Sequence, residues 1–85
     1  MFQMFKKRKP TNDVKFLRDQ KGISQEELAR TVETISKKQF GKATPLSVQT
    51  VKAIEEYRYM PTFGLAQLIA EALDEDLETV FNKIK

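Results

Sequence analysis

The 85-residue sequence contains no cysteine, no histidine and no tryptophan. Without cysteine the chain has no disulfide framework and no thiolate metal site, and without histidine it lacks the commonest imidazole ligand and proton shuttle. Only carboxylates and lysines remain for acid-base chemistry, so we expect no enzyme activity, metal, cofactor or small-molecule substrate. We expect a reducing, cytoplasmic setting for such a chain.

Long apolar runs are also absent. No segment approaches the roughly 20 apolar residues that a membrane-spanning helix needs, so we expect no contact with a membrane. The first ten residues, MFQMFKKRKP, lack an apolar stretch followed by a small-residue cleavage site, so we do not expect a secretory signal. The length allows one domain with a modest core.

Charge is distributed unevenly, although the net charge is only +3. Residues 1–42 carry eleven Lys and Arg against five acids, residues 43–70 carry two of each, and residues 71–85 carry two bases against five acids. This asymmetry favours one face suited to a polyanion and an acidic end turned away from it. The alternative is a solvated surface without such a role.

Apolar residues at helical spacing predict an all-α domain of five helices and no strand. The first begins near Asn12 or Asp13, and the others cover about 25–39, 48–56, 63–73 and the residues after 76. Side chains suited to N-capping and glycines suited to helix ends mark these limits. The expected caps are Ser24 with Glu27 in a capping box, Ser47, Thr62 and Asp76, and the expected stops are Gly22 and Gly41. Glu33 and Lys37 are spaced for an i,i+4 ion pair.

Residues 1–12 form a predicted arm, followed by the helical domain over 13–85. The arm combines apolar side chains with basic ones, namely Met1, Phe2, Met4, Phe5, Lys6, Lys7, Arg8 and Lys9. Its basic part is suited to lie along phosphates or enter a minor groove, or it is a tail without a special role. Its apolar part is expected to dock on apolar surface, for which Phe16, outside the stripe of the first helix, is a candidate.

Several segments, in this order and spacing, carry a family resemblance. They are Leu17-Arg18, Lys21 to Ala29, Ser47 to Glu55, Pro61-Thr62, Leu65-Ala66, Ile69-Ala70, Ala72-Leu73 and Leu77 to Phe81. The pattern resembles the phage repressor/Cro, or XRE, type of helix-turn-helix protein. This resemblance implies a lambda-repressor-like fold of five helices, binding to double-stranded DNA and a role in transcription regulation.

The helix expected over 48–56 is the candidate recognition helix, because the major groove of B-form DNA admits one α-helix. With Val51 and Ile54 buried, helical geometry turns the other side of this helix outward. The candidate base contacts on that side are Ser47, Val48, Gln49 and Lys52. Gln49 is the best of them, since its amide can bond an adenine edge bidentately. The alternative is an ordinary solvated helix face.

The resemblance also suggests residues that contact phosphates and residues that orient the recognition helix. Gln25 matches the family's phosphate-contacting glutamine at the start of the second helix. Its alternative is a helix-start residue that faces water. Thr50 and Arg58 are further phosphate candidates. Arg18 and Glu55 match positions that the family often pairs, so we expect a partly buried ion pair that orients the recognition helix.

The sequence departs from the family between the second and third helices, where residues 33–45 replace a tight turn. Extending the second helix to about residue 39 carries the chain roughly 10 Å beyond the usual turn, and residues 40–46 are long enough to return. Lys37, Lys38 and Lys42 in this insert are candidate phosphate contacts. The insert could instead bind a partner or be tolerated as surface.

The resulting hypothesis is a homodimeric repressor or activator on a pseudo-palindromic operator, with half-sites about one helical turn apart. Leu68, and Phe81 with Ile84, extend the apolar sides of the last two helices and are candidate dimer contacts. The alternative is an antitoxin-like or antirepressor module that keeps the fold and binds another protein. RNA is disfavoured, because Tyr57 and Tyr59 alone are too little for a stacking platform.

Overall fold

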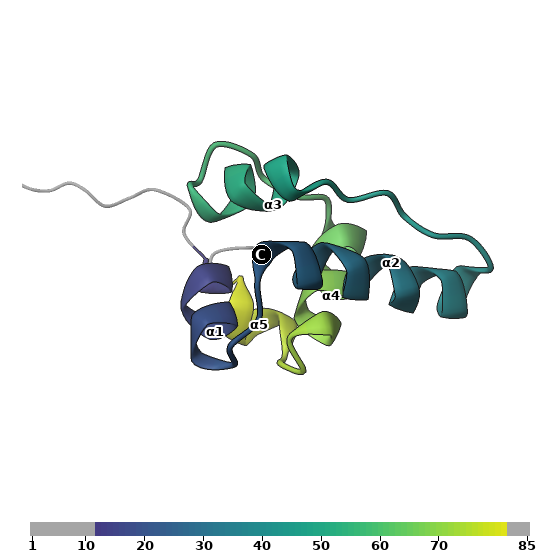
Figure 1. Ribbon diagram of the computed structural model, residues 1–85, viewed down its shortest axis with the longest axis horizontal. Helices are drawn as coiled ribbons and strands as arrows, with labels where there is room; N and C mark the ends of the chain where they lie inside the picture. Colours follow the sequence, from purple (N-terminus) through teal and green to yellow (C-terminus); the bar gives the residue numbers. More distant parts are fainter. Residues whose placement is uncertain (1–11, 82–85) are drawn as a thin grey trace, which may run out of the picture.

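The computed structural model describes residues 12–81, which fold into α-helices without a strand (Figure 1). In chain order the helices are α1 (Val14–Gln20), α2 (Gln25–Phe40), α3 (Val48–Glu55), α4 (Phe63–Ala72) and α5 (Leu77–Val80). The predicted all-α architecture of five helices is confirmed within this range. Residues 1–11 of the predicted arm, and Ile84, lie outside the described residues.

Side-chain caps mark the starts of α2, α3 and α4. The Ser24 hydroxyl accepts from the Glu27 amide and the Glu27 carboxylate accepts from the Ser24 amide, both at 3.0 Å, so the capping box at α2 is confirmed. Ser47 caps α3 by accepting from the Thr50 amide at 3.1 Å. Thr62 likewise caps α4.

The structure decides between the two candidate caps of α1 and corrects the expected cap of α5. At α1 the cap bond comes from Asn12, whose Oδ1 accepts from the Val14 amide at 3.1 Å, while the Asp13 side chain makes no such bond. Asp76 stands at the N-cap position of α5, but its side chain makes no capping hydrogen bond. The α5 helix is a single turn, and the burial of Val80 and Phe81 holds it in place instead.

Left-handed residues end the helices and turn the chain sharply. Gly22 and Gly41 have φ angles of 69° and 82°, as expected at helix stops. Tyr57 ends α3 in the same conformation with a φ of 63°, and the Arg58 amide bonds back to the Ala53 carbonyl at 2.9 Å. This is the Schellman pattern of bonds, so α3 ends at a defined point although no glycine is present there.

The core lies where α2 packs against both α3 and α4. It is formed by aliphatic side chains on the inward stripes of the helices, with Leu28, Val32, Val51, Ile54, Ile69 and Leu73 among them. Leu68 and Phe81 also belong to this core, with only 6% and 2% of their surface exposed. The prediction that these two residues extend the apolar surface beyond the needs of the core is therefore wrong, because the fold of the single chain already covers nearly all of both.

Figure 1 shows where α3 lies relative to the other helices. The long α2 helix crosses the molecule, with α3 on one side of it and the connection between α4 and α5 on the other. The chain between α2 and α3 runs back alongside the end of α2. The predicted extended connection between the second and third helices is therefore confirmed.

Candidate nucleic-acid interface

The outer side of α3 is exposed in the part of the chain that the structure describes. Val51 and Ile54 point into the core, each with 1% of its surface exposed. The four candidate base contacts, Ser47, Val48, Gln49 and Lys52, are all exposed. Ser47 is also the cap of α3, and its hydroxyl lies 2.9 Å from the Thr50 hydroxyl. The exposed side thus combines an amide, an ammonium, a hydroxyl and a small apolar group, a set that matches the chemistry of base edges.

The structure brings Arg18 of α1 and Glu55 of α3 together as a bidentate ion pair. Arg18 Nε donates to Glu55 Oε2 at 2.8 Å and Arg18 Nη2 donates to Glu55 Oε1 at 3.2 Å. Only 10% of the Arg18 side chain and 3% of the Glu55 side chain are exposed. Arg18 Nη1 also donates to the Ile23 carbonyl at 2.9 Å. This pair fixes the C-terminal end of α3 to α1 and to the connection before α2.

The hydrogen bond to Glu55 raises the pKa of the Arg18 guanidinium, and this effect outweighs the opposing effect of burial. A raised pKa in the folded state means that the contribution of the Arg18 charge to stability is fully present at every pH below the ordinary pKa of arginine. This contribution declines only as the pH rises through the higher folded-state value. The guanidinium therefore stays charged across the physiological pH range.

Gln25, the predicted phosphate contact, takes part in the same network. Its Nε2 donates to Glu55 Oε1 at 2.9 Å, so the carboxylate accepts from α1 and α2 at once. The amide nitrogen is used within the protein in this state. The sequence analysis missed this bond, because the two residues are 30 positions apart and no local pattern links them.

The insert is fastened to α2 by two hydrogen bonds that the sequence analysis also missed. The Thr44 amide donates to Oγ of the fully buried Ser36 at 2.6 Å, and the Leu46 amide donates to Glu33 Oε2 at 3.2 Å. Glu33 is thus engaged by the returning chain, and the predicted ion pair with Lys37 is wrong. Buried Leu46 stands just before the α3 cap, at a hydrophobic-staple position, which is a signal that the sequence did contain.

Replacing Ser36 with alanine is expected to lower the free energy of unfolding by about 1–3 kcal/mol, because the Thr44 amide loses its acceptor. Urea unfolding followed by circular dichroism measures the loss. The control is Thr34→Ala on the same helix, where an exposed hydroxyl donates to the Arg30 carbonyl. Equal losses for the two variants would contradict an anchoring role for Ser36.

The remaining phosphate candidates are exposed cations with different surroundings. Lys37, Lys38 and Lys42 have no carboxylate within ion-pair distance in residues 12–81. Arg58, in contrast, pairs with Glu56, with Nη2 2.9 Å from Oε1.

Helical spacing separates two of these lysines. Glu33 accepts a hydrogen bond from the loop that leads to α3, so it marks the flank of α2 that faces this loop. Lys37 is one helical turn from Glu33 and therefore lies on the same flank. Lys38 shares the opposite flank with Ile35. Of the two, Lys37 therefore lies on the flank nearer to α3.

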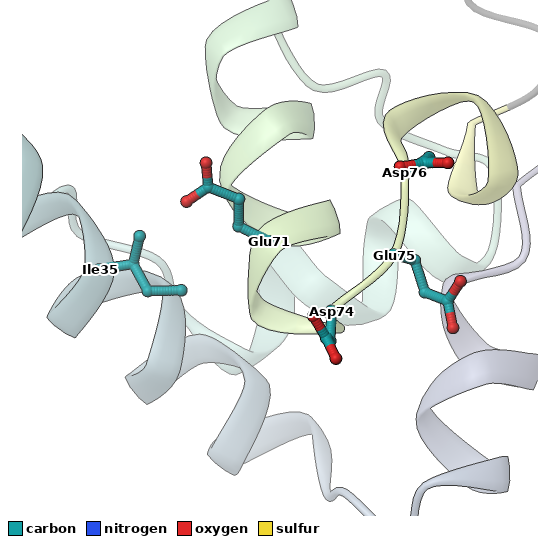
Figure 2. A pocket seen from close by; sticks show the side chains of 5 residues that line it. All are labelled: Ile35, Glu71, Asp74, Glu75 and Asp76. Atoms are coloured by element: carbon teal, nitrogen blue, oxygen red, sulfur yellow. The ribbon is translucent and has the colours of Figure 1, made fainter.

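An acidic hollow of about 480 Å³ lies by Ile35, between α2 and the connection of α4 to α5. Figure 2 shows four carboxylates around it, those of Glu71, Asp74, Glu75 and Asp76. Glu75 pairs with Lys21 at 3.2 Å. In the part of the chain that the structure describes, no three acidic side chains are grouped to hold a metal ion. This negative region opposes phosphate and lies across the molecule from α3 (Figure 1).

A sequence profile of the Helix-turn-helix family (HTH_3) matches residues 33–80, more than half of the chain. The matched segment runs from the middle of α2 to the end of α5 and includes the candidate recognition helix. The chain belongs to this family, the phage repressor/Cro or XRE type of helix-turn-helix proteins. Membership implies DNA binding and transcription regulation, and proteins of this family are typically not enzymes.

No curated protein matches the chain. Among residues 12–81, no helix has the length and apolar character needed to cross a bilayer.

Proposed function

We propose that the protein is a sequence-specific repressor that binds operator DNA as a homodimer, with α3 in the major groove. The observation that carries this proposal is the asymmetry of α3. Its inner side is fixed by Val51, Ile54 and the buried ion pair of Glu55, while the candidate base contacts on its outer side are exposed within residues 12–81. A rigid helix with free polar side chains near its N-terminus is the geometry that contacts base edges.

In the proposed complex, Gln49 bonds an adenine edge, while Ser47, Val48 and Lys52 contact neighbouring bases. Phosphates on either side are contacted by the α2 start at Gln25, by Thr50 and Arg58, and by Lys37 of the insert. Repression follows from occupancy, because a protein seated on an operator excludes other proteins from that stretch of DNA. The domain 13–85 carries these contacts, and the arm 1–12 adds phosphate contacts.

The test is selection of bound duplexes from a random pool with the full chain, followed by affinity measurements over a range of salt. We expect an enriched sequence with two related half-sites and a steep loss of affinity as salt rises. Absence of duplex binding at low salt would contradict the proposal and favour an antitoxin-like or antirepressor module. Enrichment of a single unrepeated site would contradict the dimer.

Lys37→Gln is expected to reduce the slope of log affinity against log salt by about 1, since one phosphate contact is lost. Lys38→Gln is the matched control, because it removes the same charge from the opposite flank of α2. We expect its slope to stay near that of the unmodified chain. Equal slopes for both variants would contradict the assignment of Lys37 as a phosphate contact.

A further inference from the structure

A groove of about 270 Å³ separates the end of α2 from the first half of α4. Its apolar lining comes from Phe40, Leu65 and Leu68, and the returning chain closes it at Thr44. The groove exists because α2 continues to Phe40 and the connection then turns back. It therefore belongs to the segment that departs from the usual tight turn.

One large aromatic side chain lies uncovered at this groove, and a second exposed one is a sequence neighbour of its lining residues. Phe40 lines it and has 66% of its surface exposed. Phe63 stands between two lining residues, Thr62 and Gly64, and is also exposed. Exposed apolar patches on soluble proteins mark surfaces that contact another molecule.

The charges beside the groove are of opposite sign on its two sides. Lys42, between Phe40 and Thr44 in the chain, is exposed on the α2 side and has no carboxylate partner within residues 12–81. Glu71 lines the α4 side, and its Oε1 accepts from Gln39 at 2.6 Å. A two-fold axis parallel to the groove places the basic side of one copy opposite the acidic side of the other.

We propose that this groove is the surface through which two copies of the chain associate. Each copy places Phe40 against the apolar lining of the other, and Lys42 of each copy faces Glu71 of its partner. The inference rests on the dimer of the proposed function and names its contact surface. In this arrangement the exposed Phe40, and not Leu68 or Phe81, is the main source of dimer affinity, because Phe81 is buried and only 6% of Leu68 is exposed where it lines the groove.

The test is the dimer dissociation constant by sedimentation equilibrium without DNA. We expect the unmodified chain to dimerise and Phe40→Glu to dimerise about tenfold or more weakly, because a charge would enter an apolar contact. Phe16→Glu is the matched control, since Phe16 is 62% exposed and lies on α1 at the far end of the molecule (Figure 1). A monomeric unmodified chain at high micromolar concentration, or equal dimerisation of both variants, would overturn the proposal.

Charge reversal tests the two-fold arrangement. Lys42→Glu and Glu71→Lys should each weaken the dimer, and the double variant should regain most of the affinity, because the pair is restored with reversed sign. Additive losses in the double variant would overturn the arrangement.

Binding to a duplex with a single half-site separates the two proposals. Phe40→Glu should bind this duplex as the unmodified chain does, and should lose affinity only on the complete operator. If the unmodified chain does not bind the single half-site, this result contradicts the proposed function. The dimer dissociation constant, which is measured without DNA, still tests the dimer surface.

Discussion

Replacing Arg18 with alanine is expected to lower the free energy of unfolding by about 3 kcal/mol. The variant leaves the Glu55 carboxylate, only 3% exposed, with Gln25 as its remaining side-chain donor. A buried charge without its counter-ion is costly because water cannot replace the lost partner. Urea unfolding at neutral pH measures the change.

Two further variants test the origin of this loss. Lys15→Ala removes an exposed i,i+4 pair with Asp19 on the same helix and should cost about 0.5 kcal/mol or less. Arg18→Met combined with Glu55→Leu removes both charges and should recover much of the stability. If Arg18→Ala were no more harmful than Lys15→Ala, the ion pair would not hold α3 in place.

Replacing Gln49 with alanine is expected to weaken binding to the selected operator by about 1–3 kcal/mol and to relax the base preference at one position of each half-site. Gln49 is exposed on α3, so the stability of the fold should stay unchanged. Fluorescence anisotropy with the selected duplex measures the affinity. A repeated selection with the variant identifies the position that loses its preference.

Gln20→Ala is the control for this experiment. Gln20 is an exposed glutamine at the end of α1, and its replacement should change neither affinity nor preferred sequence. A Gln49→Ala variant that keeps both affinity and sequence preference would show that another part of the molecule contacts the bases.

Local patterns in the sequence predicted the helices well, because each helix limit depends on residues close together in the chain. The box of Ser24 with Glu27, the cap Ser47 and the stops Gly22 and Gly41 all act within a few positions. The outward side of α3 followed in the same way from the inward residues of the same helix. These parts of the fold needed no knowledge of distant contacts.

Contacts between distant segments were harder to predict. The periodicity of α4 places Leu68 at the edge of the apolar stripe, and only the packed fold decides that it is buried. Glu33 was assigned to the nearest cation on its own helix, whereas the returning chain offers it the Leu46 amide 13 residues away. The bond from Gln25 to Glu55 spans 30 positions. In each case a partner from another segment decided the outcome.

The hydrogen bonds at the two ends of α3 have a consequence for how operator preference can change. Glu55 attaches one end to α1 and α2, while the Leu46 amide, bonded to Glu33, steadies the entry to the other. The α3 helix is only about 12 Å long, so a small shift of the hydrogen-bonded residues at either end changes the orientation of the whole helix. In the proposed complex, we therefore expect substitutions in the insert to change which bases α3 contacts, even when the sequence of α3 stays the same.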